Sequence, residues 1–407
     1  QRQMCIRDRS YGEVGNDQIG GDRFLYLPSS YGAASDSGVN KYNFGLASNP
    51  YTSLMIVENK IGNPDLTWEK AKKMNVGVDI NLFNNCLTAS FDIFKEKRNN
   101  ILANRSTSPM IIGANLPAYN FGEMENRGWE MDLNFRHHIQ DFHYWARFNY
   151  SFARNEIIYM DEVQKRYDYQ MTTGRRKNQF FGLIFDGYYN SWEEINALDR
   201  PKSSWSGNQL QPGDVKYVDV NRDGVIDDYD MVPIGYTPVP EIIYGFSFGA
   251  QYKGFDFSIL FQGADNVSIK YFGRSMWPFA KGEESAKSLI KERWTQERYE
   301  AGEKITFPRL SLNPNGETDH NYRPSTLWIR DASYLRLKNL EVGYTFTGGF
   351  VKRLNLNSVR LYFNGSNLFT WTDVVDLDPE APSRSGNVEI NTYPLQKVYN
   401  IGLNINF

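Results

Sequence analysis

Hydrophobic and polar residues alternate with a period of two along several stretches of the chain. In the first clear stretch, residues 75–82, every second position is apolar: Val76, Val78, Ile80 and Leu82. The positions between them are polar or small. Successive side chains of an extended strand point to opposite faces. This stretch therefore predicts a strand with one apolar and one polar face.

The same alternation returns in pairs of stretches that are separated by short turn sequences. Asn84 and Asn85 follow the first stretch, and asparagine tolerates the positive φ of tight hairpin turns. Further alternating stretches span residues 87–93, 129–136 with 142–152, 244–252 with 255–262, 334–346 with 359–365, and 399–407. With weaker candidates near Phe24 and Gln179, the pattern predicts an antiparallel sheet of about ten to fourteen strands.

The composition of the polar face indicates where this sheet lies. It is rich in Asn, Asp, Ser, Gly and Gln with charges of both signs, which suits a hydrated lumen better than bulk water. Tyr and Phe number 26 each, and aromatic residues near strand ends are typical of interfacial girdles. Turns are short at 84–85 and 253–254, whereas residues 160–240 and 270–325 are long connections. The sequence predicts an all-β fold, a partial antiparallel transmembrane β-barrel with long extracellular loops.

The apolar face of such a barrel is expected to contact outer-membrane lipid. Seven residues represent this face: Val76, Val78, Phe91, Leu133, Phe148, Phe257 and Leu403. Part of a barrel should form a curved, unclosed sheet with two exposed edges. The last strand ends on Phe407, which predicts that the outer-membrane assembly machinery reads it. A soluble sandwich, with the apolar face buried between two sheets, stays open on the pattern alone.

Composition and motifs argue against several other classes of protein. A net charge of −3 and a pI near 6.0 offer no basic surface, so no nucleic-acid partner is expected. No stretch reaches the roughly 18 consecutive apolar residues of a transmembrane helix. Cys5 and Cys86 form no disulfide framework. The four histidines stand in no catalytic metal motif, and no nucleophile elbow or phosphate loop occurs, so we expect no enzyme.

Several short blocks carry a family resemblance. They are NPDLTWEK at 63–70, PGDVKY at 212–217, PEIIYGF at 240–246, LWIRDASYLRLKNL at 327–340, GSNLFTWT at 365–372 and DPE at 378–380. In this order and spacing they resemble the SusC/RagA family of TonB-linked outer-membrane proteins. The resemblance covers residues 10–407 and only the C-terminal part of the family's barrel.

The resemblance implies a function and a set of partners. Members of this family form a barrel of roughly 22 strands in the outer membrane of Gram-negative bacteria. They use TonB-transmitted energy and a SusD-like surface lipoprotein to import oligosaccharides or peptides. We expect the plug domain to be absent from this chain and residues 1–9 to be non-native sequence. Two alternatives remain: a passive porin, and a secreted calcium-binding adhesin or glycan-binding module.

Residues 219–230 resemble a calcium loop, D-x-N-x-D-G-x-I with an acidic twelfth position. Carboxylate and carbonyl oxygens at alternate positions suit Ca²⁺, and Gly224 provides the sharp turn. The predicted ligands are Asp219, Asn221, Asp223, the Val225 carbonyl, Asp227 and Asp230. The departures are an Asp in place of the usual Glu at position twelve and no flanking helices. The alternative is an Asp-rich turn that binds nothing.

Two further patterns fall in the long connections. Residues 282–298 carry apolar side chains at helical spacing, which predicts an amphipathic helix. Trp192, Trp205 and Trp277 could stack on sugar rings or pack within the loops, and the sequence does not distinguish these roles.

Overall fold

The computed structural model describes residues 4–16, 25–27, 32–33, 41–46, 49–54, 56–57, 61–107, 116–205, 210–271, 277–279, 288–311, 319–375, 377–380, 387–388 and 395–407. Its main feature is one ten-stranded antiparallel sheet. In sheet order the strands are β1 (Met4–Asn16), β6 (Glu69–Leu82), β7 (Leu87–Ala103), β8 (Tyr119–Ile139), β9 (Phe142–Tyr159), β16 (Ile242–Tyr252), β17 (Phe255–Asp265), β20 (Tyr334–Phe346), β21 (Ser358–Thr372) and β23 (Val398–Asn406).

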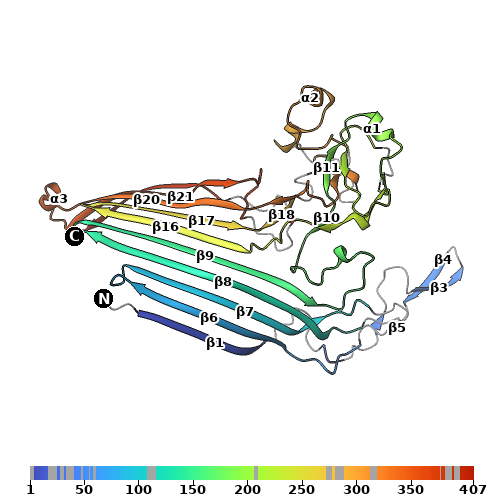
Figure 1. The fold of residues 1–407 in the computed structure, drawn as a ribbon, viewed down its shortest axis with the longest axis horizontal. Coiled ribbons are helices and arrows are strands. Elements are labelled where there is room, and N and C mark those ends of the chain that lie inside the picture. Colours follow the sequence, from blue (N-terminus) through green and yellow to red (C-terminus); the bar gives the residue numbers. More distant parts are fainter. Residues whose placement is uncertain are drawn as a thin grey trace.

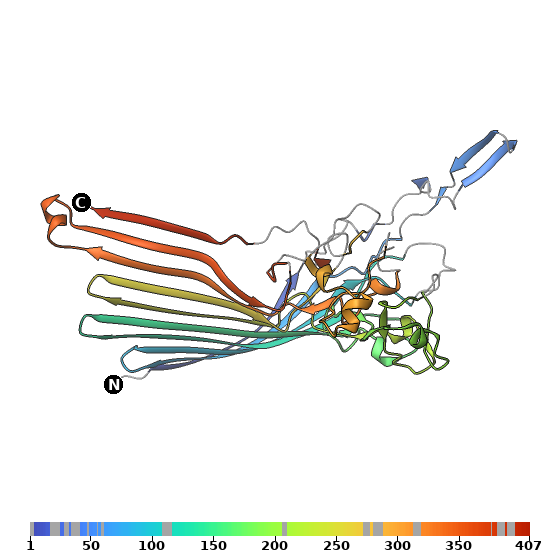
Figure 2. The same cartoon turned by 90° about the horizontal axis from the view of Figure 1, so that it is seen from above.

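This sheet is curved and open. Its margins are β1 and β23, which do not pair with each other, and Figure 2 shows them at opposite sides of the curved sheet. The predicted partial barrel is therefore confirmed, with a strand count at the lower end of the expected range. Residues 4–9, expected to be non-native, lie in β1 and pair with β6. Backbone pairing does not reveal the origin of a sequence, so that expectation stays a prediction.

The strand register places the predicted apolar residues on one face. Directly paired residues of antiparallel strands share a face. Across β6 to β9, one row is Val78, Phe91, Met131 and Tyr150. A second row runs from β8 to β17 through Leu133, Phe148, Phe246 and Phe261. Asp79, Ser90, Asp132 and Asn149 form a row of the opposite, polar face.

The connections differ in length at the two ends of the sheet. Short turns join β6 to β7, β8 to β9, and β16 to β17. Asn84 and Asn85 have positive φ as predicted, and Lys253 has positive φ as well. The short helix α3 (Phe350–Arg353) lies at this end, which Figure 1 shows on the left with both chain termini. All the long connections emerge at the other end. The predicted asymmetry is confirmed.

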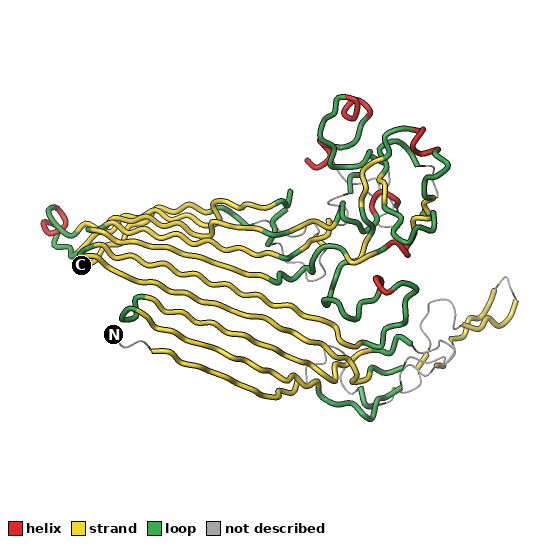
Figure 3. Tube along the Cα trace, viewed as in Figure 1, coloured by secondary structure: helices red, strands yellow, loops and turns green. Residues whose placement is uncertain are grey.

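Two long connections fold together into a compact body, which we call the cap: the described residues of 180–235 and of 266–333. Figure 3 shows its loops and short helices gathered at one end of the strands. Its elements are β10 (Phe181–Gly182), β11 (Phe185–Tyr188), α1 (Trp192–Asn196), β12 (Lys202–Ser203), β13 (Val215–Tyr217), β14 (Val225–Ile226), β15 (Val232–Pro233), β18 (Ser268–Tyr271), α2 (Gln296–Glu300) and β19 (Ile329–Asp331). Its buried core includes Leu183, Val215, Phe307, Tyr322, Leu327 and Trp328.

A separate hairpin extends from the same end of the sheet. It consists of β3 (Lys41–Leu46) and β4 (Asn49–Leu54), which pair along their whole length. The hairpin lies in the connection between β1 and β6, and Figures 1 and 2 both show it projecting away from the cap.

The predicted helix over 282–298 is wrong in its described part, 288–298. A 3-10 helix covers Ser288–Glu292, and α2 begins only at Gln296. Between them the backbone N–H of Trp294 donates to the carbonyl of Phe307, 2.8 Å away. This tertiary contact interrupts the helical spacing, and Thr295 starts a new helix as its N-cap. No helix among the described residues is long and apolar enough to span a membrane.

The structure separates the roles of the three loop tryptophans. Trp277 is buried in the cap core, and Trp205 packs against that core beneath Arg323, whose guanidinium lies 4.0 Å from the Trp205 ring centre. Trp192 is exposed at the start of α1. Near Gln179, the weak strand candidate corresponds to the two-residue strand β10, which pairs with β15 outside the ten-stranded sheet. Phe24 lies outside the described residues.

Candidate functional site

A cavity of about 420 Å³ lies on the polar face of the sheet, at the end that carries the long connections. Its floor comes from β6 to β9, and its rim comes from Lys177 and the segment 237–241 that leads into β16. Its lining combines charged and polar side chains with apolar ones: Glu69, Glu96, Arg98, Ile101, Met124, Glu125, Asn126, Ala153, Asn155, Met160, Lys177, Thr237, Val239, Pro240 and Glu241.

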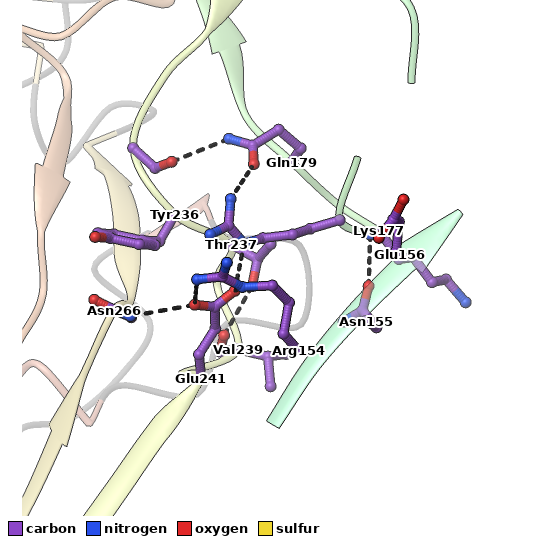
Figure 4. Close-up of polar contacts among 12 residues, drawn as sticks. Arg154, Asn155, Glu156, Lys177, Gln179, Tyr236, Thr237, Val239, Glu241 and Asn266 are labelled. Carbon is purple, nitrogen blue, oxygen red and sulfur yellow. Dashed lines mark hydrogen bonds and ion pairs between the residues drawn. The ribbon is translucent and has the colours of Figure 1, made fainter. Parts of the chain in front are cut away.

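Glu241 is the most constrained polar residue of this cavity. Its side chain is only 4% exposed. Arg154 donates from Nε and Nη2 to its two carboxylate oxygens at 2.9 and 2.8 Å, Arg176 donates from Nε, and the Asn266 amide donates at 3.2 Å. Figure 4 shows Arg154 and Asn266 converging on Glu241. One carboxylate therefore ties β9, the rim segment and the end of β17 together.

Electrostatics keep this carboxylate ionised. Burial alone would raise the pKa of Glu241, but the guanidinium groups of Arg154 and Arg176 outweigh burial, so its pKa lies below the ordinary value. A buried carboxylate that lost these partners would carry an uncompensated charge, which costs several kcal/mol. Glu241 is thus a positioning residue that fixes the rim.

The rim and floor of the cavity are fixed by further hydrogen bonds and ion pairs. The backbone N–H of Lys177 donates to Asn155 Oδ1 at 2.7 Å, as Figure 4 shows. The side-chain amide of Gln179 donates to the carbonyls of Ile234 and Gly235. In the floor, Glu96 pairs with Arg98 at 2.8 Å and with Lys73 at 3.3 Å.

Such a lining offers hydrogen-bond donors, acceptors and charges of both signs. Its members include no His, Cys, Ser or Tyr that could act as a nucleophile or a histidine base. The arrangement suits reversible binding of polar molecules. Sequence reasoning missed this cavity, although Pro240 and Glu241 stand in one of the family blocks and gave a signal for it.

A second polar cluster joins two of the family blocks. Arg336, only 2% exposed, pairs with Asp378 at 2.6 Å and with Glu380 at 2.7 Å, and Lys338 pairs with Glu380 at 3.0 Å. Arg336 shares the polar face of the sheet with Gln262. The DPE block therefore anchors the connection after β21 to β20.

The predicted calcium loop folds as a set of tight turns. Asp219 accepts hydrogen bonds from the backbone N–H groups of Arg222 and Gly224, at 2.7 and 2.8 Å. Gly224 has the expected positive φ. Asp230 is fully buried and accepts from the backbone N–H groups of Val220 and Asp227, and burial is the main cause of its raised pKa.

The other predicted ligands follow the same pattern. Asn221 Oδ1 accepts from the N–H of Asp223, Asp223 accepts from that of Val225, and Asp227 accepts from that of Tyr229. The loop's carboxylates thus satisfy its own amides. Within the described chain, no group of three or more His, Cys, Asp or Glu side chains is placed to hold a metal ion. Calcium binding stays a prediction.

Comparison with known proteins identifies the family. Residues 26–368 match the family model described as TonB dependent receptor-like, beta-barrel. The chain belongs to this family. It is 27% identical to TonB-dependent receptor P3 of Formosa agariphila, over 98% of this chain and 39% of that protein. It is 26% identical to TonB-dependent receptor SusC of Bacteroides thetaiotaomicron, over 98% of this chain and 37% of that protein.

Solved structures show the same fold. The RagAB peptide importer in its open-open state superposes with a TM-score of 0.69 at 22% identity, covering 98% of this chain and 40% of that chain. A second RagAB structure gives a TM-score of 0.67. The chain spans about 40% of the length of the proteins it matches.

These findings confirm the SusC/RagA resemblance and the partial-barrel fold. They also place the protein in the outer membrane of a Gram-negative bacterium. The relatives named here are receptors and an importer, not enzymes.

Proposed function

We propose that the chain forms the C-terminal barrel wall of an outer-membrane importer for oligosaccharides or peptides. The observation that carries this proposal is the two-faced sheet. One face presents exposed apolar side chains such as Phe246, Leu361 and Ile401, and the other presents the polar cavity beside Glu241. A wall of this kind separates lipid from an aqueous lumen.

In this proposal the apolar face contacts outer-membrane lipid and the polar cavity contacts the passing ligand. Energy comes from the TonB complex, which would act through a part of the protein outside this chain. The cap and the other long connections lie on the extracellular side, where a SusD-like lipoprotein would close over them. The protein binds and passes ligands and catalyses no covalent step.

Two alternatives predict different behaviour. A passive porin would let the ligand through without TonB. A secreted adhesin or glycan-binding module would stay in buffer without detergent, but the exposed apolar face spans many neighbouring strands, from Val76 in β6 to Ile401 in β23. A surface of that size marks a contact with lipid or with another apolar phase.

The test measures uptake in the cells that produce the protein. Cells lacking the gene should lose growth on one defined oligosaccharide or peptide mixture, and cells lacking TonB should lose it equally. Uptake that persists without TonB would support the porin, and full growth without the gene would contradict import.

A charge reversal tests the role of the cavity and separates the two ligand classes. Lys177→Glu changes the charge at the rim, whereas Lys165→Glu is a matched change at an exposed lysine outside the cavity. For an acidic peptide ligand, Lys177→Glu should raise the half-saturating concentration about tenfold. A neutral oligosaccharide should be taken up almost as before. Equal effects of both variants on uptake of an acidic peptide would show that the cavity does not contact this ligand.

A further inference from the structure

The hairpin of β3 and β4 has two chemically different faces. Paired residues share a face, so one face carries Tyr42, Phe44, Leu46, Asn49, Tyr51 and Ser53. The opposite face includes Asn43 and Thr52, whose side chains hydrogen-bond at 2.8 Å. The first face contains three aromatic rings and no charged residue.

These rings are exposed to a degree that is unusual for aromatic side chains. Tyr42 is 61% exposed, Phe44 is 54% exposed and Tyr51 is 72% exposed. The rings of Tyr42 and Phe44 lie 4.7 Å apart, centre to centre, and Phe44 pairs directly with Tyr51 across the hairpin. The three rings therefore form one continuous surface, which we call the aromatic platform.

A two-stranded hairpin is marginally stable in water by itself, and clustered exposed apolar groups usually mark a binding surface. Three aromatic side chains carry about 150–250 Å² each, so their exposed fractions add up to roughly 350 Å². A stable protein interface needs about 800 Å² on each side. The platform is too small for such an interface, but it suits a few flat rings of a narrow, extended ligand.

We infer that the aromatic platform of Tyr42, Phe44 and Tyr51 binds a neutral glycan chain outside the barrel lumen. The apolar C–H faces of pyranose rings stack on aromatic faces, and the Tyr hydroxyls and Ser53 offer polar groups to sugar hydroxyls. A face without charged residues offers no ion pair to an anionic or cationic polymer, which favours a neutral ligand. The platform projects from the end of the sheet that carries the long connections, so it meets extracellular glycans before the cavity does.

This inference rests on the proposed function only in placing the platform on the extracellular side, because glycan capture at the platform needs no transport. The experiment uses the protein purified in detergent from outer membranes of its own cells. The probes are neutral hexasaccharides of glucose, xylose and mannose in β-1,4 and α-1,4 linkage, titrated by calorimetry.

The test variant is Tyr42→Ala/Phe44→Ala/Tyr51→Ala, and the matched control is Leu54→Ala, which truncates an exposed apolar side chain on the opposite face. We expect the triple variant to weaken binding of at least one hexasaccharide about tenfold or more and the control to change it less than twofold. Tyr42→Phe, which keeps the ring, should bind nearly as the natural protein does. Resistance of the ten-stranded sheet to heat in detergent checks that each variant is folded.

Three results would overturn the inference. The first is that no hexasaccharide binds the natural protein, and the second is that the triple variant binds as well as the control. The third is that the triple variant keeps glycan binding and loses co-purification of a lipoprotein, which would make the platform a protein contact. Import that proves independent of TonB would contradict the proposed function and leave the platform result unchanged.

Discussion

The sheet exposes apolar side chains on one face, whereas the cap buries its apolar side chains. In the sheet, Phe246, Leu361 and Ile401 stay exposed on a face that no described segment covers. In the cap, Phe307, Tyr322 and Trp328 are at most 3% exposed and pack against one another. The cap completes its own core in water, whereas the sheet needs a second apolar phase to cover one face. One chain therefore contains a part that buries its own apolar core and a part that leaves one apolar face uncovered.

Removing the last strand should have the largest effect, and only on the sheet. Deletion of residues 399–407 removes most of β23, which pairs with β21 from Val398 to Asn406. We expect no folded protein in the outer membrane, because β21 loses its partner and the assembly signal is gone. The amount of folded protein is measured from its heat-modifiable gel mobility in outer-membrane fractions. Deletion of residues 41–54 is the control, since the sheet pairs stay intact. Normal levels of the truncated chain would remove the targeting role of this strand.

The next largest effect should be confined to the cap. Phe307→Ala empties a buried site beside Trp328 and should cost the cap about 3–5 kcal/mol. Hydrogen exchange should speed up for amides of residues 180–235 and stay unchanged in β6 to β9. Phe246→Ala, on the exposed face of the sheet, is the control and should leave the cap protected. If Phe307→Ala increased the exchange rates of cap amides and sheet amides equally, the two regions would be one cooperative unit.

A charge on the apolar face should damage the sheet and spare the cap. Val78→Arg places a cation where lipid is expected and should cost about 2–4 kcal/mol near the membrane midplane. Asp79→Ala, one residue along on the polar face, should be milder. The folded fraction in outer membranes distinguishes them. Equal assembly of both variants would show that the facing assignment is wrong.

Acid should weaken the cap through one buried histidine. His320 Nδ1 lies 2.9 Å from Ser203 Oγ, and Nε2 lies 2.8 Å from the Val215 carbonyl. Burial lowers the pKa of His320 and outweighs the hydrogen bond to Val215 and the Asp214 carboxylate, which raise it. The unfolded chain therefore takes up a proton first as the pH falls.

This order of protonation means that the cap becomes less stable as the pH falls. Cap stability is full above about pH 6.5 and declines below it, by at most about 1.4 kcal/mol per pH unit, until the folded pKa is reached. Protease resistance of the cap between pH 7.5 and 5 measures this decline. His320→Gln should flatten the profile, and His143→Gln, at the exposed short-turn end, should not. A slope that survives His320→Gln would assign the pH dependence elsewhere.

Calcium should have the smallest effect, again on the cap alone. With the weak affinity of about 10⁻⁴ to 10⁻³ M that is typical of extracellular calcium modules, about 1 mM Ca²⁺ should stabilise the cap by roughly 0.4–1.4 kcal/mol. Thermal unfolding of the cap with calcium and with chelator measures this. Asp223→Asn should abolish the difference, and Asp186→Asn, outside the loop, should keep it. Identical melting with calcium and with chelator would contradict the site.

The sequence predicts the sheet far better than the cap, for a physical reason. A strand with two different environments must alternate, so Val76 to Leu82 and the Asn84-Asn85 turn show themselves locally. The cap core has no such period, because Leu183, Phe307 and Trp328 come from separate irregular segments. The expected helix over 282–298 is wrong in its described part, 288–298, for the same reason: the contact between Trp294 and Phe307 overrides local spacing.

The candidate cavity could not be predicted from the sequence, for a similar reason. Glu241 pairs with Arg154 and Arg176, which lie 87 and 65 residues away from it in the sequence. No local pattern links these residues, although the block at 240–246 marks the place. The turns of the loop at 219–230 were predictable because the residues that form them lie within twelve consecutive positions. Calcium binding there stays a prediction.

The points at which the cap joins the sheet have a consequence for how such proteins diversify. β9 and β16 are hydrogen-bonded neighbours although residues 160–241 separate them, and β17 and β20 are neighbours across residues 266–333. The ends of each insertion are therefore held together by the sheet. Doubling the length of a flexible insertion adds only about 0.6 kcal/mol of closure entropy. Extracellular segments can thus be lengthened, shortened or exchanged between lineages, while the strands that meet the membrane keep their register.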